Sequence, residues 1–134
     1  MARILLVDDE PRIVTFLEKG LKRQCHEAES ALNGREALDM VLSKPFDLIL
    51  LDLGLPVIDG FDVLSKLRET KQSLPVMIIT ARGELDCARA IKLGANDCIH
   101  KPFRFSELLP KLKRLLGEPV PSIADSVTGY STWS

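Results

Sequence analysis

The sequence predicts a single α/β domain in which helices cover both faces of a doubly wound parallel sheet. Short apolar runs alternate along the chain with longer segments whose apolar residues recur at helical spacing. The clearest apolar runs are nearly continuous rather than alternating, which is typical of strands that helices bury on both faces. The chain has 134 residues, 46% of them hydrophobic and 28% charged, which suits one soluble domain of this kind.

Five strands are expected, each followed by a helix. The strands are expected at 4–7, within 25–31, at 48–51, at 75–79 and, as a short strand, at 98–99. The second is the weakest prediction, because its polar and apolar residues alternate poorly. The helices are expected to begin at Pro11, after Asn33-Gly34, at Gly60 and near 84, and the last to carry leucines from 108 to 116. Gly94 and Gly117 are expected to end the last two helices.

Charge and cysteine content exclude several functional classes. The net charge of −1 and the isoelectric point near 6.1 give no support for a nucleic-acid or membrane surface. No apolar run approaches the length of a membrane span, and no signal peptide follows Met1, so we expect a cytoplasmic protein. The three cysteines, at 25, 87 and 98, are odd in number and lack CxxC spacing, so we expect free thiols.

The last residues of the chain differ in composition from the rest. The stretch GEPVPSIADSVTGYSTWS at 117–134 contains no Lys or Arg and holds the single Tyr and the single Trp of the chain. We therefore assign residues 1–117 to the folded domain and 118–134 to a linker or disordered tail.

Polar residues follow four of the expected strands, at the edge where an open parallel sheet places its working site. The first strand ends in Asp8-Asp9-Glu10, and the others end at Asp52, Thr80 and Lys101. Each residue alone is ordinary, because acidic residues often cap helices, Thr favours strands and Lys before Pro is commonly on the surface. Together they predict a functional site.

Clustered carboxylates repel one another, and a divalent cation such as Mg²⁺ relieves that repulsion by binding oxygen ligands. A Lys added to an acidic metal site indicates that a second anion is handled there. Phosphoryl transfer needs this combination, and a carboxylate can be the nucleophile that forms an acyl phosphate. Gly54 would let the backbone approach the metal closely.

Four segments give the chain a specific resemblance to receiver domains of two-component response regulators. They are VDDE at 7–10, LILLDLGLPVIDG at 48–60, VMIITARGE at 76–84 and GANDCIHKPF at 94–103. The resemblance covers residues 3 to about 116 and implies a flavodoxin-like sheet with the strand order 2-1-3-4-5. The stretch KPFRFSELLPKLKRLL also resembles the last helix of receivers that are attached to winged-helix DNA-binding domains.

The resemblance implies a role for each residue of the predicted site. Asp52 would accept the phosphoryl group, and Asp9 would ligate Mg²⁺ (or Mn²⁺) directly while Asp8 acts through water. Asp52 and the carbonyl of Gly54 would complete the protein ligands. Thr80 would then bond the phosphoryl group, and Lys101 would pair with it. Such a domain is not a multiple-turnover enzyme; it catalyses its own phosphorylation and slow autodephosphorylation.

The resemblance also implies partners. The donor would be a sensor histidine kinase, and phosphorylation would remodel the face made by helix four, strand five and helix five. That face would control homodimerisation and transcription, through charged residues for which Lys92, Asp97, Lys111 and Arg114 are candidates. DNA would be bound only through an effector domain absent from this chain, and no membrane partner is expected.

Two departures from the family pattern bear on signal transmission. Receivers usually have Tyr or Phe three residues before the Lys, as a switch residue that moves with the Thr, whereas this chain has Cys98. We therefore expect weaker or differently routed coupling, with helix four or a neighbour filling the gap beside the small thiol. Thr80 and Lys101 are also 21 positions apart, one fewer than usual, which places a deletion in the loop ARGELD before helix four.

Two other functional hypotheses compete with that of a receiver domain. An aspartyl phosphatase would typically carry a second Asp two residues after the first as general acid, and Gly54 at that position cannot transfer a proton. A receiver-like binding module with weak or phosphorylation-independent signalling is the alternative that Cys98 favours, although Asp9, Asp52, Thr80 and Lys101 argue against it.

Overall fold

A computed structural model of the chain describes residues 1–71 and 73–118. Its strands are β1 (Arg3–Val7), β2 (Glu27–Ala31), β3 (Leu48–Asp52), β4 (Val76–Thr80) and β5 (Asp97–His100). Its helices are α1 (Pro11–Arg23), α2 (Gly34–Ser43), α3 (Gly60–Thr70), α4 (Glu84–Lys92) and α5 (Phe105–Leu115). All strand pairs are parallel, and the order β2-β1-β3-β4-β5 confirms the predicted fold class and strand order.

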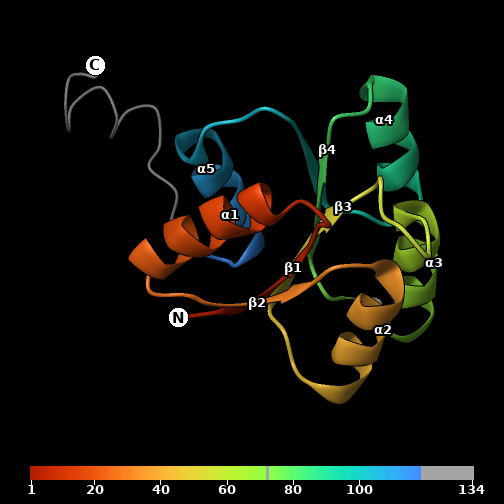
Figure 1. Cartoon of the computed structure of the whole chain (residues 1–134), viewed down its shortest axis with the longest axis horizontal. Helices are drawn as coiled ribbons and strands as arrows, with labels where there is room; N and C mark the ends of the chain where they lie inside the picture. Colours follow the sequence, from red (N-terminus) through yellow and green to blue (C-terminus); the bar gives the residue numbers. More distant parts are fainter. Residues whose placement is uncertain (72, 119–134) are drawn as a thin grey trace.

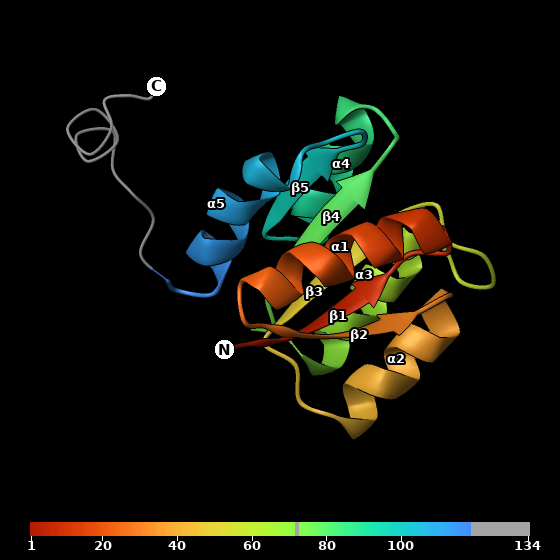
Figure 2. The same ribbon diagram turned by 60° about the vertical axis from the view of Figure 1, so that its left-hand side comes forward.

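Helices cover both faces of the sheet, and alternate strand residues point to opposite faces. One core cluster joins Leu5, Ile49 and Ile78 to the apolar sides of α2, α3 and α4. The other joins Leu6, Leu50 and their neighbours to α1 and α5. Figure 1 and Figure 2 show α1 and α5 on one side of the sheet and the other three helices on the opposite side. This two-sided burial explains why the central strands are apolar throughout.

Strand register brings the predicted site residues to one edge. Val7 is paired with Leu51, so the residues after them, Asp8 and Asp52, come out side by side. Asp52 is in turn paired with Ile79, which places Thr80 one position further along the neighbouring strand. His100 is paired with Thr80, and therefore Lys101 follows at the same edge. The sheet alone collects side chains separated by more than ninety positions in the sequence.

The start of α3 packs tightly under the end of β3. The Gly60 amide donates to the Leu53 carbonyl at 3.0 Å. A Cβ on Gly60 would lie 2.6 Å from the Asp52 carbonyl oxygen and 2.5 Å from the Leu53 Cα. Only glycine fits here without movement of the backbone that carries Asp52. The predicted role of Gly60 in starting the helix therefore includes support of the site.

Arg68 of α3 fastens the connection between α4 and β5. Its guanidinium donates to the Gly94 carbonyl from Nε at 2.9 Å and from Nη2 at 2.8 Å. It also donates to the Asn96 side chain at 3.0 Å and to the Leu74 carbonyl before β4 at 2.7 Å. Gly94, predicted to end α4, has a φ of +114° that favours glycine.

The prediction of three free thiols is wrong, because Cys87 and Cys98 form a disulfide. Cys87 lies one turn into α4 and Cys98 lies in β5, so two elements that are neighbours only in the folded chain bring the sulfurs together. The gap beside the small side chain of Cys98 is thus filled from α4, as predicted. Cys25 is exposed and free.

Two further predictions concern the C-terminal tail and membrane spans. The predicted linker or tail at 118–134 lies outside the described residues, apart from Glu118. None of the helices in the described part of the chain combines the length and apolar character that a membrane span requires.

Candidate functional site

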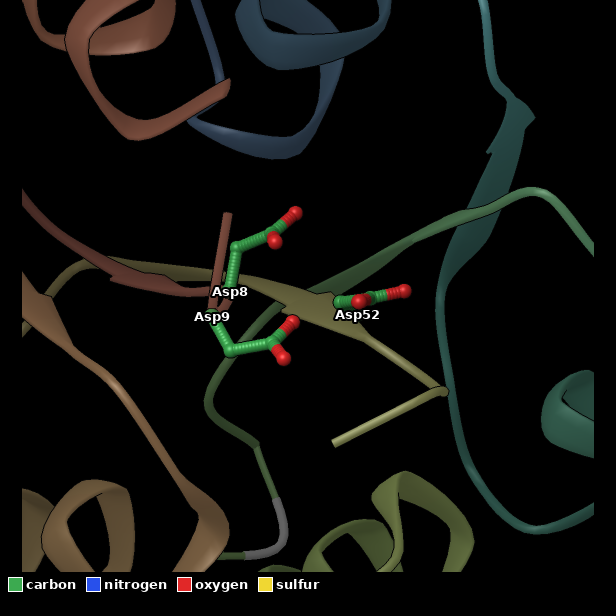
Figure 3. Close-up of side chains that lie close together, drawn as sticks. All are labelled: Asp8, Asp9 and Asp52. Atoms are coloured by element: carbon green, nitrogen blue, oxygen red, sulfur yellow. The ribbon is translucent and has the colours of Figure 1, made fainter. Parts of the chain in front are cut away.

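Three carboxylates meet at the edge of the sheet where β1 and β3 end. Asp8, Asp9 and Asp52 each offer an oxygen, and these oxygens all lie within 4.8 Å of one another. Figure 3 shows the three side chains near one another at the two strand ends. Asp8 is fully buried and Asp52 is 6% exposed, whereas Asp9 is open to solvent. The group therefore has two buried carboxylates and one accessible carboxylate, a donor set that suits a hard divalent cation.

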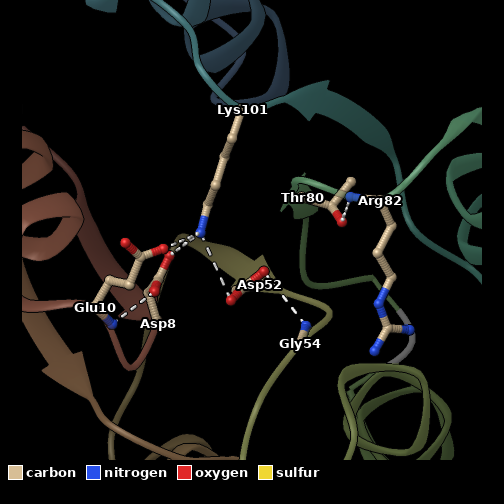
Figure 4. Close-up of polar contacts among 7 residues, drawn as sticks. All are labelled: Asp8, Glu10, Asp52, Gly54, Thr80, Arg82 and Lys101. Carbon is tan, nitrogen blue, oxygen red and sulfur yellow. Dashed lines mark hydrogen bonds and ion pairs between the residues drawn. The ribbon is translucent and has the colours of Figure 1, made fainter.

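Lys101 reaches over this group from the end of β5. Its Nζ lies 2.9 Å from Asp8 Oδ2, 3.7 Å from Asp52 Oδ2 and 3.4 Å from Glu10 Oε1 (Figure 4). The Lys101 side chain is only 11% exposed, so water screens these ion pairs weakly. One ammonium faces four carboxylates when Asp9 is included, which leaves the site formally negative. The Lys101–Pro102 peptide bond that follows is cis.

The pKa values of the site follow from this crowding. Burial raises the pKa of Asp52, the Asp8 and Asp9 charges raise it further, and Lys101 and the Gly54 amide oppose them incompletely. Burial by itself lowers the pKa of Lys101, but its contacts with Asp8, Asp52 and Glu10 outweigh burial and raise it. Ionisation of Asp52 is thus electrostatically unfavourable in the folded chain, and a bound cation would make it more favourable.

Two backbone amides orient the carboxylates. The Glu10 amide donates to Asp8 Oδ1 at 2.9 Å, and the Gly54 amide donates to Asp52 Oδ1 at 3.4 Å. Asp52 Oδ2 is the oxygen that faces Lys101. A Cβ on Gly54 would meet no described atom within 4 Å, so packing does not require glycine here. The role of the Gly54 carbonyl as a metal ligand stays a prediction.

Thr80 lies fully buried at the end of β4, and its hydroxyl accepts a hydrogen bond from the Arg82 amide at 2.9 Å (Figure 4). The Arg82 side chain pairs with Asp59 at 3.5 Å and lies 5.8 Å from the centre of the Phe61 ring. Sequence reasoning missed Arg82. Its position two residues after Thr80, a common distance for a hydroxyl-capped turn, was the available signal.

Of the four residues predicted for a dimer face, two form an ion pair within the chain and two are exposed. Asp97 and Lys111 pair with each other within the chain at 3.3 Å and join β5 to α5. Lys92 and Arg114 are exposed. The predicted switch residue Cys98 follows Asp97 in β5 and is half-buried and bonded to Cys87 of α4. The use of this face in a dimer stays a prediction.

Comparison with known proteins decides the family. Residues 4–113 match the family of response regulator receiver domains. The chain belongs to this family. A receiver domain is a phosphorylation-activated signalling domain that binds Mg²⁺ at an acidic site, and response regulators receive their phosphoryl groups from sensor histidine kinases. In this chain the carboxylates of Asp8, Asp9 and Asp52 form an acidic cluster at the corresponding edge of the sheet.

Curated relatives of this receiver domain include a transcriptional regulatory protein and a response regulator. The chain is 38% identical over 117 residues to the transcriptional regulatory protein PcoR of Escherichia coli, with 87% of this chain and 52% of PcoR covered. It is 39% identical over 127 residues to the response regulator ArlR of Staphylococcus aureus, with 93% of this chain and 58% of ArlR covered. The chain therefore spans little more than half the length of these relatives.

Two of the solved structures that match are covered along nearly their whole length. The response regulator TrrA of Thermotoga maritima, in complex with Mg²⁺ and BeF, is 36% identical with a TM-score of 0.79, covering 86% of this chain and 99% of TrrA. A CheY-like receiver domain protein of Methanospirillum hungatei is 29% identical with a TM-score of 0.83, covering 87% of this chain and 94% of the other.

Proposed function

We propose that Asp52 is the residue of this receiver domain that accepts the phosphoryl group, with a phosphohistidine of a sensor histidine kinase as donor. The observation that carries the proposal is the convergence of three carboxylates within 4.8 Å under Lys101, whose Nζ is 3.7 Å from Asp52. Asp52 Oδ2 is the carboxylate oxygen that faces Lys101, and we assign nucleophilic attack on phosphorus to this oxygen. Small phosphodonors would replace the kinase in solution.

The acidic cluster fits a bound Mg²⁺ (or Mn²⁺). Asp9, the exposed member, would ligate the cation directly, and the buried Asp8 would act through water. Asp52 and the carbonyl of Gly54 would complete the protein ligands. When bound, the cation would neutralise charge on the phosphoryl oxygens and lower the repulsion that raises the Asp52 pKa.

Lys101 and Thr80 would hold the product. Lys101 is tied more closely to Asp8, at 2.9 Å, than to Asp52, at 3.7 Å, so a phosphoryl group on Asp52 competes for an ammonium already within reach. The Thr80 hydroxyl accepts a hydrogen bond from the Arg82 amide, and its own hydrogen is available to donate to a phosphoryl oxygen. Movement of Thr80 would disturb the loop that leads directly into α4.

We propose transcriptional control as the output of the whole protein, because PcoR and ArlR are regulators and the chain spans only part of each. DNA would be bound by an effector domain that follows the receiver. The face of α4, β5 and α5 would control homodimerisation. Lys92 and Arg114 are exposed there for contact with a second copy, and the Asp97–Lys111 pair would be exchanged between copies or retained within each.

The test is incubation of the chain with phosphoramidate and Mg²⁺, followed by intact mass measurement. We expect a gain of one phosphoryl group that is lost in Asp52→Asn and without divalent cation. Asp39→Asn is the matched control, because Asp39 is an exposed carboxylate of α2 that pairs with Arg35 and not with a residue of the site. No gain in mass while Mg²⁺ binding is confirmed would instead favour a phosphorylation-independent binding module.

A further inference from the structure

Cys87 and Cys98 connect the two elements that lie beside the end of β4. Cys87 is the fourth residue of α4, and Cys98 is the second residue of β5. Their Cα atoms are 6.0 Å apart, within the range in which two cysteines bond without movement of the backbone. Only 11 positions separate them in the sequence. The bond therefore closes a small loop at the edge of the sheet.

The two sulfurs have different surroundings. Cys87 is 8% exposed, packed against the sheet, whereas Cys98 is half-buried at the border of the core cluster under α2, α3 and α4. The exposed imidazole of His100 places Nε2 3.6 Å from the Cys87 sulfur. Cys98 is thus the more exposed of the two residues, and Cys87 has an imidazole nitrogen beside it that can accept a proton when it carries none.

The core does not depend on this bond. The two apolar clusters are built mainly from buried residues of β1, β3 and β4 and the facing helices. β5 adds only Ile99 to one cluster, α4 adds only Ala90 to the other, and Cys98 borders the latter. The edge position of β5 leaves one of its sides without a strand neighbour among the described residues. Opening the bond would therefore free α4 and β5 locally without dismantling the sheet.

We infer that Cys87 and Cys98 form a reversible dithiol–disulfide site that exchanges with small disulfides and thiols, and whose closure fastens α4 to β5. The inference goes beyond phosphoryl acceptance by Asp52. Its consequence for signalling rests on the proposed function: α4 follows Thr80 after three residues, so a fastened α4 would respond less to a phosphoryl group on Asp52.

Closure proceeds by thiol–disulfide exchange in two steps. The Cys98 thiolate attacks one sulfur of the small disulfide, whose S–S bond breaks, and the released thiolate takes the proton that Cys98 gave up. The Cys87 thiol then passes its proton to His100, and its sulfur attacks Cys98 in the mixed disulfide. The second small thiolate leaves and takes that proton. The two cysteines lose two electrons, and the small disulfide is reduced to two thiols.

The test uses the full chain carrying Cys25→Ser, which removes the exposed free thiol. The protein is equilibrated in buffers of reduced and oxidised glutathione, and the products are trapped with acid and analysed by mass spectrometry. We expect a single two-electron transition with loss of two hydrogens and a Cys87–Cys98 cross-linked peptide. Amide hydrogen exchange over residues 84–92 should slow severalfold on oxidation, while exchange in β3 is unchanged.

The matched control is Cys25→Ser with Cys87→Ala, in which exchange over α4 should be the same in both buffers. The main comparison uses one protein in two redox states, so it does not depend on the folding of the control. Glutathione adducts on Cys98 without an internal bond would overturn the inference, as would an internal bond that leaves α4 exchange unchanged.

Phosphoryl acceptance is measured separately on the same samples with phosphoramidate and Mg²⁺. A chain that closes the bond and slows α4 but gains no phosphoryl group supports the dithiol site and overturns only the proposed function. A chain that is phosphorylated on Asp52 but never joins its cysteines overturns only the dithiol site.

Discussion

Strands β3 and β5 belong to the same sheet but differ in what holds them. All five residues of β3 are buried, and the strand is hydrogen-bonded to β1 on one side and β4 on the other. β5 has four residues, one of them buried, and is bonded to β4 at the edge of the described sheet. β3 carries Asp52 and β5 carries Cys98. The proposed phosphoacceptor thus lies on a buried strand that is paired on both sides, whereas the disulfide to α4 lies on an edge strand.

Core truncation should give the largest contrast between these regions. Leu50 of β3 is fully buried, so Leu50→Ala should lower the free energy of unfolding by about 2–5 kcal/mol. Leu85 of α4 is 87% exposed, and Leu85→Ala should change it by less than about 0.5 kcal/mol. Urea unfolding under reducing conditions measures both. Similar losses in the two variants would remove the contrast.

Removal of the Asp52 charge should stabilise the fold. Burial and the Asp8 charge raise the pKa of Asp52 above that of an unfolded aspartate, so the ionised form opposes folding. The gain in Asp52→Asn should be absent below the unfolded pKa, grow as pH rises through the folded pKa, and be complete above it. We expect a melting temperature a few degrees higher at neutral pH.

Thermal unfolding of Asp52→Asn and of the control Asp39→Asn across pH provides the measurement. Added Mg²⁺ should raise the melting temperature of the parent chain more than that of Asp52→Asn, because the variant lacks one ligand. A lower melting temperature for Asp52→Asn at neutral pH would contradict the destabilisation that we assign to the ionised Asp52 carboxylate.

Thr80→Ala should separate phosphorylation of Asp52 from the response of α4 to it. The variant loses the hydroxyl that accepts from the Arg82 amide, at a cost of about 1 kcal/mol, but keeps every carboxylate. Asp52 should still be phosphorylated, whereas the change in α4 hydrogen exchange on adding beryllium fluoride should be lost. Thr80→Ser keeps the hydroxyl and should retain the change; loss of the response in both variants would assign it to the methyl group instead.

The smallest effect is expected at the edge of the sheet. Asp97 and Lys111 form a partly exposed ion pair at 3.3 Å, so Asp97→Asn should cost between 0 and about 1 kcal/mol, less in high salt. Urea unfolding at two salt concentrations measures this cost. A larger loss that salt does not reduce would show that the edge strand is held as firmly as β3.

The apolar residues of β1, β3 and β4 predicted those strands, because residues buried on both faces leave an unmistakable pattern. β2, with the sequence EAESA, carried little such pattern, and it is held by parallel pairing with β1 rather than by its own composition. The site at the strand ends was predictable for the same reason. Parallel register converts the position after each strand into a common location, so Asp8, Asp52, Thr80 and Lys101 could be grouped from sequence alone.

The disulfide was not predictable from the cysteine count. An odd number of cysteines without short spacing favours free thiols, and pairing across α4 and β5 depends on how the helix rotates over the sheet. The buried positions Cys87 and Ala90 of α4, three apart on one helical face, were the available signal that Cys87 points inward. Arg82 was missed because its link to Thr80 runs through a backbone amide, which any residue would supply.

The two ends of α4 are held unequally. At its C-terminal end, the Arg68 guanidinium grips the Gly94 carbonyl with two hydrogen bonds, so this end is anchored to α3. At its N-terminal end the cap is Gly83, which has no side chain to close the first turn. With the Cys87–Cys98 bond open, we expect such a helix to move more at its N-terminal end, near Leu85, than near Ile91. Cys87 lies in the N-terminal half of α4, so its bond to Cys98 restrains the end of the helix that is otherwise held less firmly.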